Sequence, residues 1–532
     1  MNMNNDPASS LWWRGAALYQ IYPRSFQDVN GDGVGDLAGI TRHMDYIADL
    51  GVDGIWISPF FTSPMHDFGY DVSDYRDVDP IFGTLADFDA LVAAAHERGL
   101  RVIIDQVYAH SSIDHPWFAE SRADRTNDKA DWYVWADAKA DGTPPNNWQS
   151  VFGGPAWTWD ARRRQYYMHS FLKEQPQLNV HEVAVQDALL DVARFWLDRG
   201  VDGFRLDALN HCMHDPLLRD NPPAPADGRV RTRPFDYQIR LHSQSQPGVI
   251  GFIERFRALC DGYGAIFTLA EVGGDKAEEE QKAYTKGDGR LSSAYGFEFL
   301  YAPALTPRFV ADTVAGWREG EGWPCWAFEN HDAPRAVSRW CAREDRDRFA
   351  RMKMALLIAL RGNIILYQGE ELGLEQDEIP FELLRDPEAI ANWPLTLSRD
   401  GCRTPMPWTE GPGGGFTTGT PWLPLSAVNL ARAVDRQEES GESMLAHTRR
   451  LLALRRETVA LRTGRQERVT VDDGLLAFSR IEGDQHIGCL FNLSTEAITP
   501  AGMPPAATVL LSVNDASPRL LPAYSALFLL YS

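Results

Sequence analysis

The sequence predicts an α/β protein built on a (β/α)8 TIM barrel, with a subdomain inserted after the third strand and a C-terminal β-sandwich domain. Short apolar runs alternate with longer amphipathic stretches, as in repeated βα units around a parallel sheet. The alternation stops between His110 and about residue 180, where Trp, Gly, Pro and Asp accumulate. After residue 457 it gives way to closely spaced strand-like segments.

Eight apolar runs are the predicted barrel strands, and amphipathic segments between them are the predicted helices. The clearest helices are expected at 37–50, 84–100, 183–200, 251–263 and 346–361. The strands are expected at 17–23 (ALYQIYP), 54–60 (GIWISPF), 101–107 (RVIIDQV), 203–208 (GFRLDA), 265–272 (AIFTLAEV), 292–300 (SSAYGFEFL), 325–330 (CWAFEN) and 363–369 (NIILYQG).

The same pattern sets the expected domain boundaries. The barrel takes residues 1–110 and 178–457, and the inserted subdomain takes residues 111–177. A last barrel helix is expected at 443–457, and residues 458–532 contain the strand-like segments LLAFSRI, HIGCLFNL, ATVLLS and YSALFLLYS. A chain of 532 residues is long enough for one large core with insertions, or for two to three domains.

Composition argues against several classes of protein. A formal charge of −22, with no basic cluster, disfavours nucleic acid as a partner. No run approaches the roughly 18 apolar residues of a membrane span, so no membrane partner is expected. The first residues lack the features of a secretory signal, which makes the cytoplasm the expected location. Six cysteines without a CxxC pair suit reduced thiols in the core.

Charged residues close four of the predicted strands. In a TIM barrel, catalytic side chains stand at the carboxyl ends of the strands. Any one such carboxylate could equally be structural, but four in chain order on one rim favour catalysis. Neighbouring carboxylates raise each other's proton affinity, so one can stay protonated beside an ionised one, as glycoside cleavage requires. The residues concerned are Asp105, His110, Arg205, Asp207, Glu271, His331 and Asp332.

The motifs DQVYAH, GFRLDA, TLAEV and FENHD occur in the order seen in the α-amylase superfamily, glycoside hydrolase family thirteen. YQIYPRSF, DFGYDVSDY, YQGEELGL and RTPMPW are similar to phrases of its α-glucosidase and oligo-1,6-glucosidase group. The resemblance covers nearly the whole chain. It implies that Asp207 is the nucleophile, Glu271 the general acid and base, and Asp332 the carboxylate that stabilises the transition state, while Arg205 keeps Asp207 ionised.

The resemblance also implies a binding site for a single glucose. His110 and His331 would donate hydrogen bonds to the sugar in the −1 subsite. Asp67 and Tyr70 would close the non-reducing end, with Arg403 paired to Asp67. A closed end implies release of one glucose at a time.

The stretch DVNGDGVGDL, residues 28–37, begins like an EF-hand loop, but position twelve of that loop is Gly39 instead of the bidentate Glu. The resemblance implies a structural Ca²⁺, or alternatively Mg²⁺, and no organic cofactor. A solvated turn that binds no metal is the alternative. Ala109 stands where the family usually has Asn, which puts an interdomain calcium ligand in doubt. The implied ligands are Asp28, Asn30, Asp32, Val34 through its carbonyl, and Asp36.

The expected activity is exo-acting, retaining hydrolysis of α-glucosides, through two carboxyls about 5 to 5.5 Å apart. Ala208 follows the proposed nucleophile and favours α-1,4 over α-1,6 linkages by comparison with the group. The Pro- and Asp-rich segment 210–238 is expected to wall the acceptor side, or else to be an ordinary surface loop. Transglucosylation would use the same intermediate. The alternatives are a sucrose hydrolase or isomerase, an α-1,6-glucosidase, and a non-catalytic transporter partner subunit.

Overall fold

The computed structural model describes residues 11–228, 230–317, 320–500 and 507–531. The first ten residues, on which the expectation about export largely rests, lie outside this range, as does position 229 of the long segment after the fourth strand. Among the described residues, no helix combines the length and the apolar character that a membrane crossing needs.

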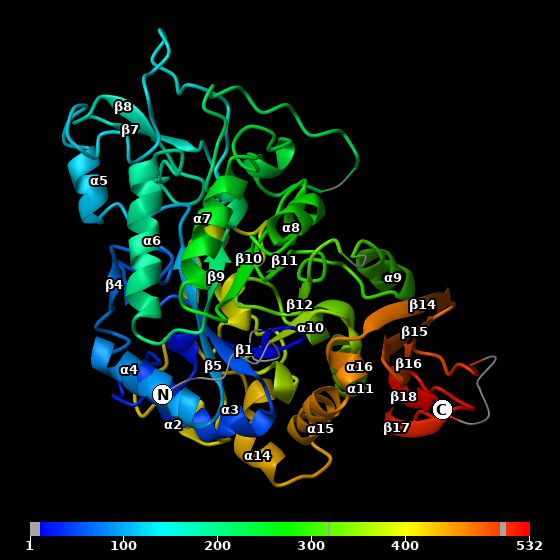
Figure 1. Cartoon of the computed structure of the whole chain (residues 1–532). Coiled ribbons are helices and arrows are strands. Elements are labelled where there is room, and N and C mark those ends of the chain that lie inside the picture. The colour runs from blue at the N-terminus through cyan, green and yellow to red at the C-terminus, as the bar shows by residue number, and fades with distance from the viewer. Residues whose placement is uncertain (1–10, 229, 318–319, 501–506, 532) are drawn as a thin grey trace.

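Eight parallel strands form the barrel, in the order β11-β10-β9-β5-β2-β1-β13-β12. An additional parallel bridge joins Ala294, in the first strand of this order, to Pro324, which directly precedes the last strand. This bridge brings the two edges of the sheet together. The predicted (β/α)8 barrel is therefore confirmed (Figure 1). Its strands are β1 (Ala17–Ile21), β2 (Gly54–Ile57), β5 (Arg101–Val107), β9 (Gly203–Asp207), β10 (Phe267–Glu271), β11 (Ser293–Tyr295), β12 (Cys325–Ala327) and β13 (Asn363–Tyr367).

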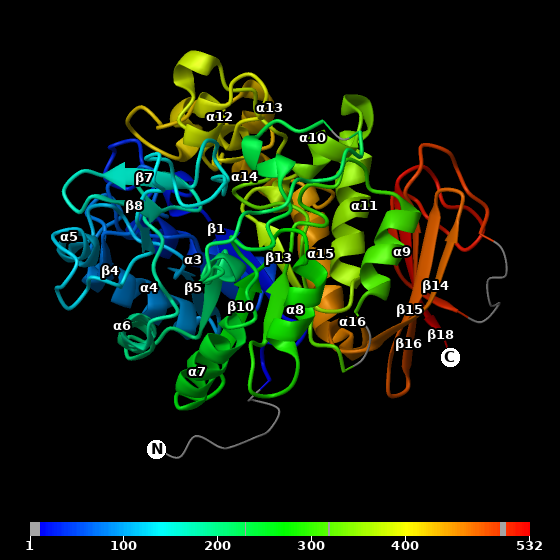
Figure 2. The same ribbon diagram turned by 90° about the horizontal axis from the view of Figure 1, so that it is seen from above.

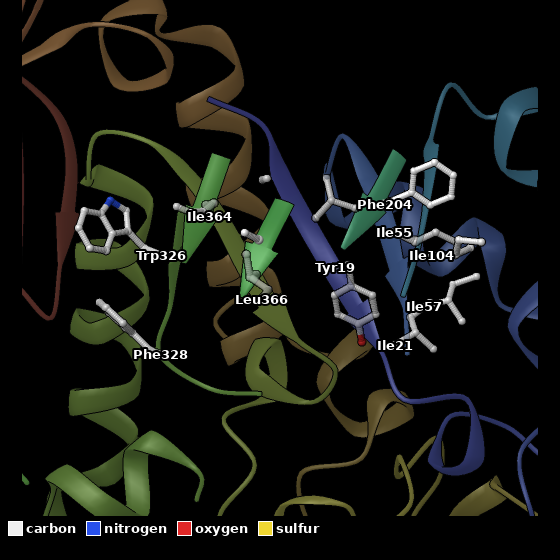
Figure 3. Close-up of a cluster of buried hydrophobic side chains, with 14 of the residues drawn as sticks. Tyr19, Ile21, Ile55, Ile57, Ile104, Phe204, Trp326, Phe328, Ile364 and Leu366 are labelled. Carbon is white, nitrogen blue, oxygen red and sulfur yellow. The ribbon is translucent and has the colours of Figure 1, made fainter. Parts of the chain in front are cut away.

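The barrel strands bury both of their faces, which is why they read as nearly continuous apolar runs. Successive side chains alternate between the faces. One set, including Trp56, Ile103 and Phe267, clusters inside the barrel. The other set packs between the strands and the helices, where Figure 3 shows Tyr19 and Ile55 among others.

Helices surround the sheet on its outside (Figure 2). Local signals set several of their ends: Thr84 and Asp87 form a capping box at the start of α4, and Gly51, with φ 88°, ends α3 in the left-handed conformation. The helices around the barrel are α2 (Leu37–Arg42), α3 (Met44–Leu50), α4 (Leu85–Glu97), α6 (Val183–Leu197), α7 (Val249–Asp261), α8 (Ala277–Thr285), α9 (Pro307–Ala315), α10 (Ala336–Trp340), α11 (Arg346–Ala359) and α15 (Met444–Glu457).

The helix expected at 37–50 is in fact two helices, because the chain leaves helical geometry at His43. The His43 ring stacks on Trp408 with the centroids 3.6 Å apart, and its Nε2 lies 2.8 Å from Oε1 of Gln27. These two contacts come from segments distant in sequence, so periodicity alone could not predict the break.

The inserted segment forms its own small sheet from β6 (Trp135–Ala136), β7 (Trp157–Asp160) and β8 (Gln165–Met168), with α5 (Pro116–Ser121) beside it (Figure 1). An antiparallel bridge joins His110 to Gln177, so the chain leaves and re-enters the barrel at neighbouring points. The boundaries at 111 and 177 stay a prediction. A shorter excursion after β2 carries β3 (Phe61–Thr62) and β4 (Asp74–Val78).

The C-terminal strands form one five-stranded antiparallel sheet, in the order β14-β15-β16-β18-β17. It lies against the side of the barrel next to α9 and α11 (Figure 2). The predicted C-terminal β domain is therefore present. Its strands are β14 (Arg465–Asp472), β15 (Leu475–Glu482), β16 (Gln485–Asn492), β17 (Thr508–Val513) and β18 (Ser525–Tyr531), and the smaller helices α12 (Pro387–Ala391), α13 (Ala427–Leu430), α14 (Val434–Glu438) and α16 (Val459–Arg462) precede it.

Candidate active site

The charged residues predicted at the strand ends meet at one end of the barrel. Asp105 on β5 lies opposite Arg205 on β9 in the register of the two strands. Asp207 is two residues further along β9 and so points to the same face as Arg205. Glu271 ends β10, which pairs with β9 on its other side. Three carboxylates and one guanidinium therefore share the inner rim.

Arg205 holds these three carboxylates together. Its Nη1 donates to Asp207 Oδ1 at 2.6 Å and to the two oxygens of Asp105 at 2.8 and 2.9 Å. Its Nη2 lies 2.6 Å from Glu271 Oε1. The Arg205 side chain is fully buried, so water does not weaken these contacts as it would at the surface. The guanidinium fixes Asp207 and Glu271 relative to each other.

This cluster holds more negative than positive charge. Burial raises the pKa of Asp207 well above its ordinary value, and the charges of Glu271 and Asp105 raise it further, against the effect of Arg205. Because one guanidinium cannot neutralise three carboxylates, the cluster keeps a proton near neutral pH. Arg205 lowers the pKa of Asp207 but does not outweigh burial and the two neighbouring carboxylates.

Asp332, in the loop after β12, has different surroundings. Its Oδ1 accepts from Arg403 Nη2 at 2.7 Å and from Arg399 Nη1 at 3.2 Å. Burial disfavours the charge on this carboxyl, but His331 and the two guanidinium groups outweigh burial and hold its pKa below the ordinary range. Asp332 is therefore ionised at neutral pH.

The expected pairing of Arg403 with Asp67 is wrong. Arg399 Nη2, not Arg403, donates to Asp67 Oδ1 at 3.2 Å, and the same nitrogen donates to Asp386 at 2.7 Å. Arg403 turns instead to Asp332 and to the carbonyl of His331, with its Nε 2.7 Å from that oxygen. The pKa of Asp67 is raised to about 6, because burial outweighs the nearby guanidinium groups.

Tyr70 and the two predicted histidines complete the cluster. The Tyr70 hydroxyl lies 2.6 Å from His331 Nε2, and the two rings stack with their centroids 5.4 Å apart. His110 Nε2 lies 3.0 Å from the Tyr70 carbonyl oxygen. Burial lowers the pKa of His331 to about 3 and that of His110 to about 4, so both rings are neutral at physiological pH. All nine predicted catalytic and substrate-binding residues thus lie in one connected region.

Ala208, directly after Asp207, has left-handed backbone angles, φ 40° and ψ 44°. This conformation costs of order 1 to 3 kcal/mol for a residue other than glycine. It aims the Ala208 N–H at Glu271 Oε2, at 3.2 Å. The strained residue directly after Asp207 therefore contacts Glu271 through its backbone.

The predicted metal ligands all lie on the turn 28–36 between β1 and α2. The Asp28 carboxylate accepts the N–H groups of Gly31 at 2.7 Å and Gly33 at 2.8 Å. Asp36 accepts that of Gly39 at 2.6 Å. In the part of the chain that the structure describes, no three His, Cys, Asp or Glu side chains are grouped as metal ligands. An oxygen-only donor set is the chemistry of a hard cation, and the metal stays a prediction.

Four residues of this region had no role in the expected site. Asp105 was a candidate because it stands near the end of a predicted strand, but only the fold shows that Arg205 pairs with it. Arg399 is four residues before Arg403, in SRDGCRTPMPW, and nothing in that phrase says which arginine reaches Asp67. Gln175, whose Nε2 lies 3.2 Å from Asp67 Oδ2, comes from the insertion, which has no periodic pattern. Tyr295 could have been found, because strand alternation places it on the inner face of β11.

Comparison with known proteins agrees with this geometry. A model of the α-amylase catalytic domain matches residues 20–464. A probable α-glucosidase of Rhizobium meliloti (strain 1021) is 53% identical over 513 residues, which cover 94% of this chain and 93% of the relative. An oligo-1,6-glucosidase of Parageobacillus thermoglucosidasius is 35% identical over 521 residues, covering 91% of each. The crystal structure of an α-glucosyl transfer enzyme superimposes with a TM-score of 0.93 at 51% identity, covering 98% of this chain and 99% of the other.

A TIM barrel with paired carboxylates at its carboxyl end defines the class: a glycoside hydrolase. The chain belongs to the α-amylase family, glycoside hydrolase family thirteen, among its α-glucosidases and oligo-1,6-glucosidases. The predicted family is thereby confirmed.

Proposed function

We propose that the protein is a retaining, exo-acting α-glucosidase that releases terminal α-1,4-linked glucose from short oligosaccharides such as maltose. One observation carries this proposal: Arg205 donates a hydrogen bond to Asp207 and forms an ion pair with Glu271, beside an ionised Asp332. Two carboxyls held side by side can supply both groups that a retaining glycosidase needs, an attacking carboxylate and a proton donor.

The reaction takes two displacements. Asp207 forms a bond to the anomeric carbon while the bond to the departing oxygen breaks, and Glu271 gives its proton to that oxygen. Glu271 then takes a proton from water, whose oxygen displaces Asp207 from the same carbon. Asp332 stabilises the positive charge that develops on the sugar ring in both steps. Two inversions return the α configuration.

The substrate preference rests on the two ends of the site. Asp67, held by Arg399 and Gln175, would accept the hydroxyl groups at the non-reducing end of a terminal glucose. Ala208 after the nucleophile supports an α-1,4 preference, by the tendency of the group. The relative named an α-glucosyl transfer enzyme supports transfer to a sugar or alcohol as a second outcome of the same intermediate.

The turn 28–36 is proposed to hold a Ca²⁺, or Mg²⁺, as a structural ion. Asp28, Asn30, Asp32 and Asp36 with the Val34 carbonyl would be its ligands. The ion would fasten the connection between β1 and α2, and Asp207 and Glu271 carry the bond cleavage without it.

The test is an NMR time course with maltose, isomaltose and sucrose as separate substrates. We expect α-glucose to appear first and to mutarotate later, with maltose consumed fastest. If isomaltose or sucrose is consumed faster than maltose, the protein is instead an α-1,6-glucosidase or a sucrose-acting enzyme. First release of β-glucose would exclude the retaining mechanism.

Three variants assign the roles. Asp207→Ala and Glu271→Gln should each lower maltose hydrolysis by at least about a thousandfold with an unchanged thermal unfolding temperature, since catalytic groups of this kind contribute on that order. Asp472→Ala, at an exposed carboxylate of β14, is the control and should keep wild-type activity. Full activity in either active-site variant contradicts the assignment.

A further inference from the structure

Tyr295 ends β11 on the inner face of the barrel, and its hydroxyl lies between Glu271 and Arg205. The hydroxyl is 2.9 Å from Glu271 Oε1, 3.0 Å from Arg205 Nη2 and 3.2 Å from Arg205 Nε. Only 1% of the residue is exposed. Burial raises the pKa of Tyr295 well above its ordinary value, so the hydroxyl keeps its proton.

Donor and acceptor rules fix the direction of these bonds. A guanidinium can only donate, so the Tyr295 oxygen must accept from Arg205. The single hydroxyl proton is then left for Glu271 Oε1, which also forms an ion pair with Arg205 Nη2 at 2.6 Å. An oxygen that already accepts this hydrogen bond beside a guanidinium charge is the poorer place for the acidic proton. The transferable proton therefore sits on Oε2, whose one recorded partner is the Ala208 N–H at 3.2 Å.

We propose that Tyr295 is a positioning residue that holds Glu271 with Oε2 facing the leaving oxygen. This proposal rests on the proposed function, in which Glu271 is the acid and base. Without the hydroxyl, Arg205 alone would hold Oε1, and the carboxyl could rotate or move its proton to the wrong oxygen. Phenylalanine at this position keeps the packing against Trp56, whose ring centroid is 6.1 Å away, and removes only the hydrogen bonds.

The first readout is the dependence on the leaving group. A sugar alkoxide needs a proton to depart, whereas p-nitrophenolate departs without one, so misplaced acid catalysis slows maltose far more. We expect Tyr295→Phe to lower kcat/KM for maltose by about tenfold to a hundredfold relative to kcat/KM for p-nitrophenyl α-glucoside. This parameter reports the steps up to the covalent intermediate, where Glu271 acts as the acid.

The second readout is the pH profile. The Tyr295 hydroxyl donates to the ionised form of Glu271 and so favours that form. Its loss should move the alkaline limb of kcat/KM to higher pH. Other charged groups around Glu271 are unchanged in the variant, and each belongs to a neighbouring element: Asp105 on β5, Arg205 and Asp207 on β9, and Asp332 after β12.

Tyr284→Phe is the matched control. Tyr284 on α8 is also buried and donates to a glutamate, with its hydroxyl 3.3 Å from Glu280 Oε1, but that carboxyl is not part of the proposed catalytic set. The Tyr284→Phe variant should keep the wild-type ratio of kcat/KM for the two substrates and the wild-type alkaline limb of the pH profile. The proposal is overturned if Tyr295→Phe lowers kcat/KM equally for maltose and p-nitrophenyl α-glucoside and leaves the alkaline limb of the pH profile where it is in the wild type.

Glu271→Gln separates this proposal from the function on which it rests. If Glu271 is the acid, that variant loses maltose hydrolysis and retains a measurable burst of p-nitrophenolate. If Glu271→Gln still hydrolyses maltose at the wild-type rate, the proposed function fails, whatever Tyr295→Phe does. If Glu271→Gln behaves as expected and Tyr295→Phe does not, only the role of Tyr295 is refuted.

Discussion

Arg399 organises the proposed glucose-binding end of the site more than any residue predicted there. Its guanidinium contacts Asp67, Asp332 and Asp386, which come from three separate segments of the chain. Its planar fork of five donors holds these carboxylates in fixed directions, which the flexible ammonium group of a lysine would not. The position of Asp67 therefore depends on a residue far from it in sequence.

The raised pKa of Asp67 predicts a pH-dependent affinity for the sugar. A carboxyl with a pKa of about 6 gains a proton as the pH falls through 6, and it then loses acceptor strength toward sugar hydroxyls. In the inactive Asp207→Asn background, maltose affinity measured by calorimetry should fall by up to about tenfold between pH 7 and pH 5, because the ionised fraction of a group with a pKa of about 6 falls by that factor. This background removes the titration of the nucleophile.

The double variant Asp207→Asn, Asp67→Asn is the control for that measurement. It should bind maltose weakly at every pH, with a flatter profile than the single variant. Equal pH slopes in the two proteins would show that Asp67 does not titrate in this range.

The sequence predicts where the carboxylates at the strand ends lie, and it predicts the contacts that hold them less well. Asp207 and Glu271 close apolar strands, and strand ends in a barrel have a known position. Arg399 and Arg403 are four residues apart around the short helix η7 (Arg399–Cys402), and only the tertiary fold of that turn decides which one meets Asp67. The break at His43 has the same origin, because its stacking partner Trp408 is distant in the chain.

At the scale of elements, the turn 28–36 joins the first barrel strand to α2 and also touches a late segment of the chain. Asp28 accepts the Thr417 hydroxyl as well as the N–H groups of its own turn. The turn thus connects the beginning of the barrel with the region after β13. A cation in this turn would strengthen that connection.

Chelation should therefore affect stability more than catalysis. Ligand at a hundred times its Kd stabilises the folded state by about 2.7 kcal/mol, so removing Ca²⁺ should lower the thermal unfolding temperature by a few degrees. Hydrolysis of maltose well below that temperature should change less than twofold. Scanning calorimetry with EDTA and with added Ca²⁺, in parallel with activity assays, measures both.

Asp32→Asn is the companion variant for the chelation experiment. Asp32 is exposed, and its Oδ1, which accepts the Val34 N–H at 2.8 Å, has a counterpart in asparagine. Its unfolding temperature should no longer respond to Ca²⁺. Loss of activity on chelation without loss of stability would place the ion in the active site instead.

At the scale of the whole molecule, buried histidines make stability depend on pH. His447 on α15 is 3% exposed, its Nε2 lies 3.1 Å from the Arg351 carbonyl, and burial lowers its pKa to about 4. The unfolded chain protonates this group near pH 6.5, so it binds more protons than the folded state between these values. Stability from this group is present above pH 6.5 and is lost as the pH falls toward 4.

The His447→Gln variant isolates this effect from the other titrating groups. The difference in unfolding free energy between wild type and variant should shrink by about 1.4 kcal/mol per pH unit below pH 6.5. Chemical denaturation at pH 7.5, 6.0 and 5.0 measures this difference. A difference that stays constant with pH would mean that His447 is not neutral in the folded protein.

A buried arginine of the C-terminal sheet, Arg480 of β15, donates to the Ala359 carbonyl of the barrel at 2.6 Å. Beside it, Arg455 of α15 donates to the carbonyl groups of Gly15, Ile358 and Gly362 at 3.2, 2.5 and 2.6 Å, all within the barrel. If the chain ended before β15, the Ala359 carbonyl at the end of α11 would lose its donor, and apolar surface beneath the sheet would meet water. The barrel and the C-terminal sheet therefore form one cooperative folding unit. A truncation or gene fusion at residue 458 would destabilise both parts.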